Sequence, residues 1–444
     1  MATIDTLNVL GNALKVATPL PMQNSIITRS SFYDLIKQAV GITARRQGRR
    51  TEDSTQFGSA YSVGSRFERE PMPVAGTPIF ELAVYQWKKT AATVQTTWES
   101  LEEAVEGPTA FGSFLSMILM PIVEDLSDDL NRQSIGFGAG PLCRISDNWT
   151  PGNNPVLIDR AYGLGADDVN GWISGIRRGM GLVAGPILSG GSLRNGGQAV
   201  RILSVNLASN AGAGAFTIDG VVPTEWGVDD YLWLGDDQAN DAPVNGVEKK
   251  MMGARGFFDD GTIVSTLQNI SRTSYPEYNG FVIDGSASPY SGVPTNKLLH
   301  RVHDEVRIRS KRRVSHICTT PGVYRGIFGV QAALGGFGAT MPSGGTLSIG
   351  SKGVVSNAFG SGPVEIRNVP EWIPGTLLAF DASSLVRFGM ETPEWDDHGD
   401  FWKPVTVGGS RVDEWYNILR MRGQLGCREP RAGVWVTGLL ETDA

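Results

Sequence analysis

The sequence predicts a fold that combines a few helices with many short strands. Residues 107 to 141 have the periodicity of one long helix, whereas most other apolar runs are short and bounded by turn residues. The 444 residues include 56 glycines, well above the average usage of about 7%, and these follow no fixed period. Such glycines indicate many turns. A content of 41% hydrophobic and 19% charged residues is ordinary for a chain that folds.

The long predicted helix begins at Gly107-Pro108 and ends before a glycine cluster that closes at Pro141. About seven turns fit between these signals. Apolar residues recur at three- and four-residue steps along one stripe, namely Phe111, Phe114, Leu115, Ile118, Leu119, Ile122, Leu126 and Leu130. The other side is polar in the second half, with Glu124, Asp125, Asp128, Asp129, Asn131 and Arg132. This pattern predicts an amphipathic helix lying along a surface.

Pro121 interrupts this helix. A proline inside a helix removes a backbone hydrogen bond and clashes with the preceding turn, at a cost of roughly 3 kcal/mol. We therefore expect a kink, and two shorter helices with a break at Met120 are the alternative. The apolar stripe is too short to cross a bilayer, which takes about 20 apolar residues in a row. No membrane anchor is expected.

The first 98 residues predict an arm and a long hairpin. Residues 30 to 40 predict a short helix, and a basic cluster follows at Arg45, Arg46, Arg49 and Arg50. This cluster is either a solvated segment or one that docks on an acidic neighbour or faces nucleic acid. From residue 55 to 98, two extended runs flank a proline-rich break, and the return run alternates apolar residues on a covered face: Phe80, Leu82, Val84 and Trp87. An isolated two-stranded ribbon is marginal in water, so we expect the hairpin to find its partner on another chain.

The middle and end of the chain predict strands and two further helices. Strands are expected at residues 200–205, 215–218 and 231–234 in a β-rich insertion. Thr295 opens a helix to about Arg313, with a basic outer face and an apolar inner face of Leu298, Leu299, Val302, Val306 and Ile308. A strand at 314–318 and a helix from Pro321 complete a compact α/β unit. Residues 335–362 predict a surface loop with a hairpin, and extended runs are expected at 364–366, 377–380, 415–425 and 434–436.

The sequence offers no strong catalytic motif. The glycines from Gly136 to Gly140 resemble part of a phosphate loop, but they follow a helix instead of a strand. His300 and His303 lack a ligand set and are expected to be surface residues beside Asp304. Four acidic pairs could serve a glycosidase, although adjacent Asp residues are mostly turn residues: Asp167-Asp168, Asp236-Asp237, Asp259-Asp260 and Asp396-Asp397. We expect no catalytic residue, no cofactor and no metal.

Charge and cysteine usage narrow the function further. A net charge of -7 argues against a protein that coats nucleic acid, because such binding depends on Lys and Arg neutralising phosphates. Cys143, Cys318 and Cys427 are isolated, which suits a reducing compartment and neither a disulfide framework nor a zinc site. No secretory signal opens the chain, so synthesis in the cytoplasm is expected.

Several short segments occur in an order that carries a resemblance. They are residues 94–103 leading into the long helix, the helix end at 136–142, Asp259-Asp260-Gly261-Thr262, residues 270–276, and residues 423–428 with 433–439. In this layout, which spans most of residues 55 to 440, the sequence resembles the major capsid proteins of tailed bacteriophages. Pro121 and the β-rich stretch after Pro151 depart from the simplest members.

The resemblance implies an α+β fold with six parts. They are an N-terminal arm (1–54), an extended hairpin loop (55–98), a peripheral domain with the long helix as its spine (99–150), a β-rich insertion (151–285), an axial domain (286–395) and a return to the peripheral domain (396–444). It also implies that hexamers and pentamers form an icosahedral shell around double-stranded DNA. The expected partners are a separate scaffold protein, a portal, a possible decoration protein and loosely contacted DNA. Lys88 and Lys89 lie on the hairpin, but nothing identifies an Asn partner for a cross-link.

Two alternatives remain open from the sequence. The first is an encapsulin-like compartment, which belongs to the same superfamily and holds a protein cargo. The second is a β-rich glycan-acting or glycan-binding protein, suggested by 11 Trp, abundant Gly and the acidic pairs. Within the capsid hypothesis, Pro121 is the predicted bending point of the spine helix between immature and mature shells.

Overall fold

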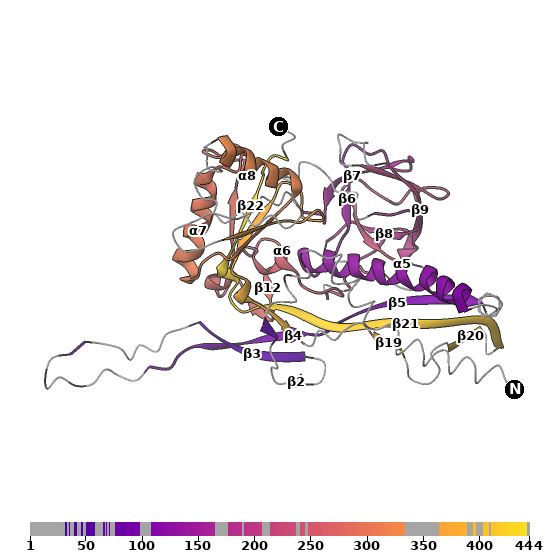
Figure 1. The fold of residues 1–444 in the computed structure, drawn as a ribbon, viewed down its shortest axis with the longest axis horizontal. Coiled ribbons are helices and arrows are strands. Elements are labelled where there is room, and N and C mark those ends of the chain that lie inside the picture. The colour runs from indigo at the N-terminus through magenta and orange to yellow at the C-terminus, as the bar shows by residue number, and fades with distance from the viewer. Residues whose placement is uncertain are drawn as a thin grey trace.

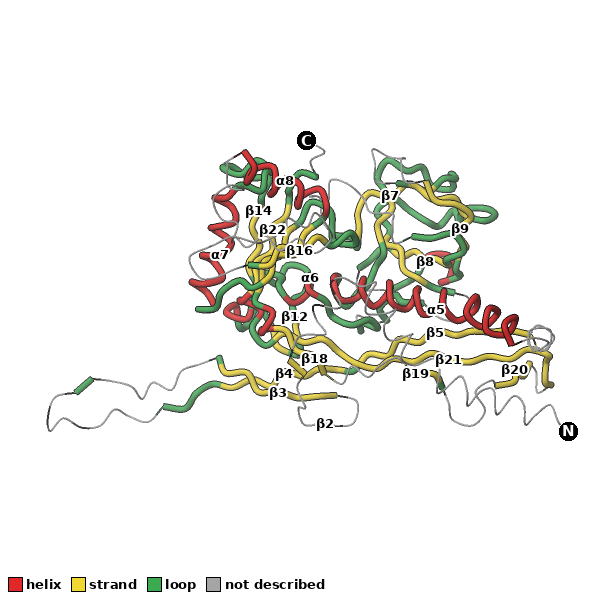
Figure 2. Tube along the Cα trace, in the orientation of Figure 1, coloured by secondary structure: helices red, strands yellow, loops and turns green. Residues whose placement is uncertain are grey.

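The computed structural model describes residues 32, 35, 40–41, 46–47, 50–57, 65–66, 68, 71, 76–97, 108–164, 176–188, 191–206, 214–236, 240–244, 247–333, 364–388, 394–396, 403–407 and 410–441. A sheet flanked by helices lies at one end of the molecule and a small barrel at the other (Figure 1). One long helix lies beneath the barrel, and two long strands run beneath this helix (Figure 1). Strands outnumber helices throughout (Figure 2), so the predicted α+β class is confirmed.

The long helix α5 (Pro108–Ile135) continues through Pro121 over 28 residues. The alternative of two helices broken at Met120 is therefore wrong. The expectation that its whole polar side lies on the surface is also wrong, because Asn131 and Arg132 in its last turns are buried. Arg132 is surrounded by protein, because it pairs with Asp129 of the same helix and approaches Asp241, which follows the last barrel strand in the sequence.

The long strand β21 (Ser410–Cys427) organises the sheet below this helix. Leu419 and Met421 are buried while Arg420 and Arg422 are exposed, which is the period of two of a half-covered strand, whereas every residue from Gly423 to Cys427 is buried. β21 pairs antiparallel with β5 (Lys88–Thr97) from Glu414 to Gly423. The same sheet includes β1 (Val40–Gly41), β18 (Leu385–Phe388), β19 (Glu394–Trp395) and β20 (Lys403–Val407).

The predicted hairpin is present, but its limits differ from the prediction. β3 (Arg50–Gln56) pairs with β4 (Phe80–Gln86), and β2 (Arg46–Gln47) joins β3. The return run divides at Trp87, because β5 leaves the hairpin to form a ten-residue ladder with β21. Trp87 marks the division by donating from its indole nitrogen to Thr51 Oγ1 at 3.1 Å.

The predicted face of β4 is also wrong. Ala83 and Tyr85 are the buried residues, whereas Phe80 and Leu82 are exposed. The physical reason is the base of the hairpin, where the Tyr85 ring packs against Phe388 with ring centroids 3.9 Å apart. This contact fixes which side of the strand faces the body.

The β-rich segment folds as a closed barrel, and the strands predicted at 200–205, 215–218 and 231–234 are confirmed. Its strands follow the closed order β10-β7-β6-β11-β8-β9. The interior is filled by side chains that include Ile158, Leu182 and Phe216. The strand bounds are β6 (Cys143–Ile145), β7 (Val156–Ala161), β8 (Gly181–Gly185), β9 (Val200–Asn206), β10 (Ala215–Ile218) and β11 (Tyr231–Leu234).

The predicted α/β unit is a five-stranded sheet flanked by α7 (Asn296–Ser310) and α8 (Pro321–Ala333). Thr295 caps α7 as expected, because its hydroxyl accepts from the Leu298 amide at 3.3 Å. Ile308 is not on the inner face and is 76% exposed, since two residues past Val306 a helix has turned about 200°. The sheet order is β14 (Phe281–Asp284), β22 (Gly433–Thr437), β17 (Leu377–Phe380), β15 (His316–Thr319) and β16 (Glu365–Asn368).

The remaining described elements are short. They are α6 (Ala254–Phe257), the pair β12 (Thr266–Leu267) and β13 (Ile270–Ser271), and 3₁₀ turns at Arg194–Gly197, Pro276–Tyr278, Ala382–Ser384 and Pro430–Ala432. Phe32 and Leu35 are helical and buried, while the rest of the predicted helix before Val40 lies outside the described residues. The predicted loop at 335–362 lies outside them as well. In the described part of the chain, no helix has the length and apolar character needed to span a bilayer.

Candidate functional site

The outer face of the hairpin presents large apolar side chains to solvent. Phe80 and Leu82 lie on this face of β4 and are 56% and 46% exposed. Ile79, which precedes the strand and is 54% exposed, has the opposite parity. The β3 residues opposite Phe80 and Leu82 are Gln56 and Ser54, which are too polar to form a core with them. Burying a side chain of this size from water contributes roughly 1.5–3 kcal/mol, so this apolar face gains stability from a covering partner.

The opposite face of the hairpin is firmly attached to the body. The Val84 amide donates to the Gln268 carbonyl at 2.8 Å, and the Phe57 ring stacks on Tyr275 at 4.6 Å between centroids. Arg428, just past β21, forms an ion pair with Asp53 of β3 at 3.0 Å. These contacts hold the apolar face in a fixed orientation. A partner that binds there needs to order little of the hairpin, which lowers the entropic cost of association.

A buried ionic cluster ties α5 to the segment that follows the barrel. The Lys250 ammonium lies 2.7 Å from Asp129 and 2.6 Å from Asp241, and its side chain is almost fully buried. Arg132 pairs with Asp129 one turn along the helix. Burial opposes ionisation of Asp129, but the Lys250 and Arg132 charges outweigh it and hold the pKa of this carboxyl below its ordinary value. The cluster therefore stabilises the junction as long as Asp129 is ionised.

We expect this cluster to give a pH-dependent stability. Because the folded-state pKa of Asp129 is depressed, its contribution is present above the ordinary carboxyl pKa of about 4 and is lost as the pH falls below it. The free energy of unfolding should therefore differ between the natural chain and Asp129→Asn at pH 7, and this difference should shrink between about pH 5 and pH 2. Urea unfolding at several pH values measures it. A difference that stays constant with pH would contradict the assignment.

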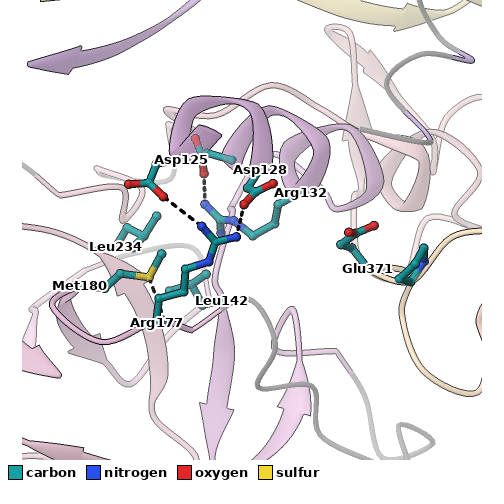
Figure 3. Close-up of a pocket in the computed structure, with 10 residues that line it drawn as sticks. Asp125, Asp128, Arg132, Leu142, Arg177, Met180, Leu234 and Glu371 are labelled. Carbon is teal, nitrogen blue, oxygen red and sulfur yellow. Dashed lines mark hydrogen bonds and ion pairs between the residues drawn. The ribbon is translucent and has the colours of Figure 1, made fainter. Parts of the chain in front are cut away.

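A pocket of about 380 Å³ lies between α5, the barrel and the segment after β16 (Figure 3). Arg177 points between Asp125 and Asp128 and pairs with both, at 3.1 Å to Asp125. Burial raises the pKa of Asp125 and also that of Glu371 on the opposite wall. The described lining includes no His, Cys or Ser. Because Arg177 pairs with Asp125 and Asp128 of α5, we interpret these two ion pairs as a link between the helix and the barrel.

The acidic pairs have structural roles where they are described. Asp259 is fully buried and accepts from the amides of Gly261, Ile263 and Val264 at 2.9–3.1 Å. Asp260 accepts from the Thr262 amide, as a turn residue does. Asp396 is buried and pairs with Lys403 at 2.7 Å and Arg420 at 2.8 Å, and Asp236 is exposed. The pair at 167–168 and the partners Asp237 and Asp397 lie outside the described residues.

The histidines and cysteines show no metal centre in the described ranges. His300 is exposed, but His303 is buried, so its predicted surface position is wrong. Burial lowers the pKa of His303. No group of three His, Cys, Asp or Glu is placed to hold an ion among the residues that the structure describes. Cys143, Cys318 and Cys427 are free and buried, and burial raises the pKa of each thiol.

The glycine segment after α5 is a packed turn instead of a phosphate loop. Gly140 has a φ of +63°, and a side chain at Gly138 would collide with the Glu248 carboxylate. That carboxylate would also repel an anion.

In the basic cluster, Arg46 lies in β2, and Arg50 is exposed and pairs with Glu52 at 2.9 Å. Arg45 and Arg49 lie outside the described residues.

Comparison with known proteins gives a likeness of fold. No protein-family model matches the chain, and no curated protein matches it. Among solved structures, the capsid asymmetric unit of cyanophage A-1(L) aligns at a TM-score of 0.49 and 8% identity, covering 92% of this chain and 93% of that one. The capsid of a native GTA particle aligns at 0.42 and 9%, covering 91% and 90%, and Microbacterium phage Oxtober96 at 0.40 and 10%, covering 91% and 90%.

Proposed function

We propose that this chain is a structural protein that self-assembles into the icosahedral capsid shell of a tailed bacteriophage. The observation that carries the proposal is the apolar outer face of the hairpin, formed by Phe80 and Leu82 of β4. A chain that acts alone has no use for two large apolar side chains held in solvent on one face of a hairpin that is fixed to the body. A shell uses many modest contacts of this kind, and their joint effect far exceeds each one alone.

In this proposal each part of the chain has a place in the shell. The residues before Arg50 form an arm, and the hairpin of β3 and β4 lies over a neighbouring subunit, whereas β5 stays in the sheet with β21. Residues 99–150 supply the spine helix, and residues 151–285 supply the insertion with the barrel. Residues 286–395 form the axial domain around the capsomer centre, to which β22 returns, and the rest of 396–444 joins the peripheral sheet through β21.

The proposed partners follow from the same assignment. Copies of the chain form hexamers and pentamers, and a separate scaffold protein, a portal and a decoration protein complete the particle. Synthesis takes place in the host cytoplasm, and the final location is the virion. The net charge of -7 suits a container wall, since tight binding over the whole surface would hinder packaging and release of DNA. The proposal assigns the chain no catalytic role.

Electron microscopy combined with sedimentation velocity tests the proposal. The purified chain, with and without its scaffold protein and over a range of salt concentrations, should form closed particles or capsomers. Monomers under all these conditions would count heavily against a shell. An encapsulin-like compartment gives particles too, and it is distinguished by a protein cargo and by the lack of neighbouring portal and terminase genes.

The glycan-binding alternative is not favoured. Sugar sites present exposed aromatic faces, but none of the eight Trp residues in the described ranges is exposed, and Trp149, Trp226, Trp233, Trp372 and Trp435 are fully buried. The described acidic pairs act in turns and ion pairs. Turnover or binding in a carbohydrate panel would revive this alternative.

Pro121→Ala tests the proposed bending point of the spine helix. The substitution restores a backbone hydrogen bond and removes a clash, which favours the straight helix by up to roughly 3 kcal/mol. If the helix bends at Pro121 during maturation, particles of the variant should assemble and expand less readily under conditions that expand the natural shell. Light scattering and cryo-electron microscopy measure the diameter. Expansion at the natural rate would remove this role from Pro121.

A further inference from the structure

The end of helix α7 carries a dense group of basic side chains in a chain that is acidic overall. Four exposed residues belong to the helix end and the turn after it, namely Arg307, Lys311, Arg312 and Arg313. Arg309, also exposed, lies about 200° round the helix from Arg307 and over the Phe281 ring. Arg431 joins this group from the turn after β21, because Arg312 and Arg431 both pair with Glu429. Arg428 joins it from the end of β21, because its amide donates to the Ser384 carbonyl next to Ser383, whose hydroxyl accepts from Arg312. These seven residues are called the basic patch below.

Helix stability explains only part of the patch. Cations in the last turn interact favourably with the helix dipole, worth about 0.3–1 kcal/mol each, and this applies to Arg307 and Arg309. Arg428 and Arg431 lie on other elements and gain nothing from α7 in this way. The patch is therefore denser in positive charge than the helix requires.

Part of the positive charge is balanced locally and part is not. Arg309 pairs with Glu305 at 3.1 Å, Arg312 with Asp381 at 3.3 Å and also with Glu429, and Arg428 with Asp53 at 3.0 Å. These pairs hold the guanidinium groups in place. Arg307 and Lys311, one turn apart on the exposed side, form no ion pair with any residue in the described ranges. They are the two charges best placed to meet an external anion.

The composition of the patch favours a polyanion over a folded protein partner. The centre of a protein interface is depleted in charged residues and enriched in aromatic ones, whereas Ile308 is the only large apolar side chain exposed on this helix end. Interfaces with nucleic acids are polar and strongly positive, and Arg and Lys bind their phosphates without reading sequence.

We propose that the basic patch binds the phosphate backbone of nucleic acid, with Arg307 and Lys311 as the principal contacts. Binding is independent of sequence and weakens steeply with salt. That the nucleic acid is packaged double-stranded DNA rests on the proposed function. The patch gives a local contact, so the otherwise acidic chain leaves most of the DNA unbound.

Fluorescence anisotropy with a labelled duplex DNA of mixed sequence tests this proposal on the full-length, unassembled protein. Compared with the natural chain, Arg307→Glu/Lys311→Glu should bind at least about tenfold more weakly at low salt, and the slope of log K against log salt should fall by about 1 to 2. The matched control Arg178→Glu/Arg201→Glu makes the same change in net charge on the exposed barrel and should bind as the natural chain does. The milder Arg307→Gln/Lys311→Gln keeps the test valid if charge reversal impairs folding.

Three outcomes would overturn the proposal. The first is that the natural chain shows no DNA binding at low salt. The second is that both double variants weaken binding equally, which would mean that only the overall charge of the protein matters. Binding of a poly-glutamate peptide that depends on the patch while DNA binding does not would identify an acidic protein as the occupant. Electron microscopy of the same variants tests the proposed function separately. If the variants form particles and bind DNA as the natural chain does, the proposed role of the basic patch is wrong while the proposed shell function stands.

Discussion

The double variant Phe80→Ser/Leu82→Ser is expected to fold normally and fail to form particles. Both side chains are about half exposed on the hairpin, so their loss costs the folded monomer little. Each is already about half buried, so covering the rest against a neighbouring copy in a shell contributes about half of the roughly 1.5–3 kcal/mol of full burial. Losing both weakens each contact between subunits by a factor of about 10 to 150. Sedimentation velocity and negative-stain microscopy measure assembly, and circular dichroism confirms the fold.

A matched control separates the hairpin from exposed apolar surface in general. Val221 and Val228 lie near the barrel and are 86% and 41% exposed. Val221→Ser/Val228→Ser should assemble as the natural chain does. Particles of natural size from the hairpin variant, or equal loss of assembly in both variants, would show that the apolar face of the hairpin does not drive the contact.

Asp259→Ala is expected to lower the free energy of unfolding by about 3–5 kcal/mol. The Asp259 carboxylate is buried among Arg255 at 3.1 Å and Arg272 at 3.7 Å, and it accepts three backbone amides. Removing it leaves the two buried guanidinium groups without a counter-charge and three backbone amides without a hydrogen-bond acceptor. Each group that is left buried without a partner costs its desolvation free energy. Urea unfolding followed by tryptophan fluorescence gives the change.

Asp260→Ala is the control for this substitution, because the neighbouring carboxylate is exposed and accepts only from the turn at Thr262. Its effect should stay near 1 kcal/mol or below. Equal effects of the two substitutions would mean that the buried ion pairs do not stabilise the fold. Either substitution is expected to leave the DNA affinity of the folded protein unchanged, because neither residue is part of the basic patch.

Elements with strong local signals could be predicted from the sequence. Both α5 and α7 could be located in the sequence, because their signals depend only on nearby residues. These signals are the apolar period and the end residues of α5 and the Thr295 cap of α7. The strands β9, β10 and β11 were likewise marked by apolar runs between turn residues. Local signals do not decide whether the helix continues through Pro121. The outcome depends on tertiary packing of the helix, which can outweigh the loss of one backbone hydrogen bond.

Features that depend on distant residues could not be predicted. The alternation in β4 fits either face, and contact of Tyr85 with Phe388, some 300 residues away, determines which face is buried. The pairing of Lys250 with Asp129 joins residues 121 positions apart and has no local signature. The sequence indicated that the hairpin needs a partner, but only the structure identifies the exposed side chains of Phe80 and Leu82 as the surface that requires one.

The most direct test of this account is a cryo-electron microscopy reconstruction of the assembled protein at a resolution that shows side chains. The account predicts that Phe80 and Leu82 are covered by an adjacent copy of the chain, with the pairing of β3 and β4 retained. Particles in which these side chains remain in solvent, or a monomer whose own residues cover them, would contradict it.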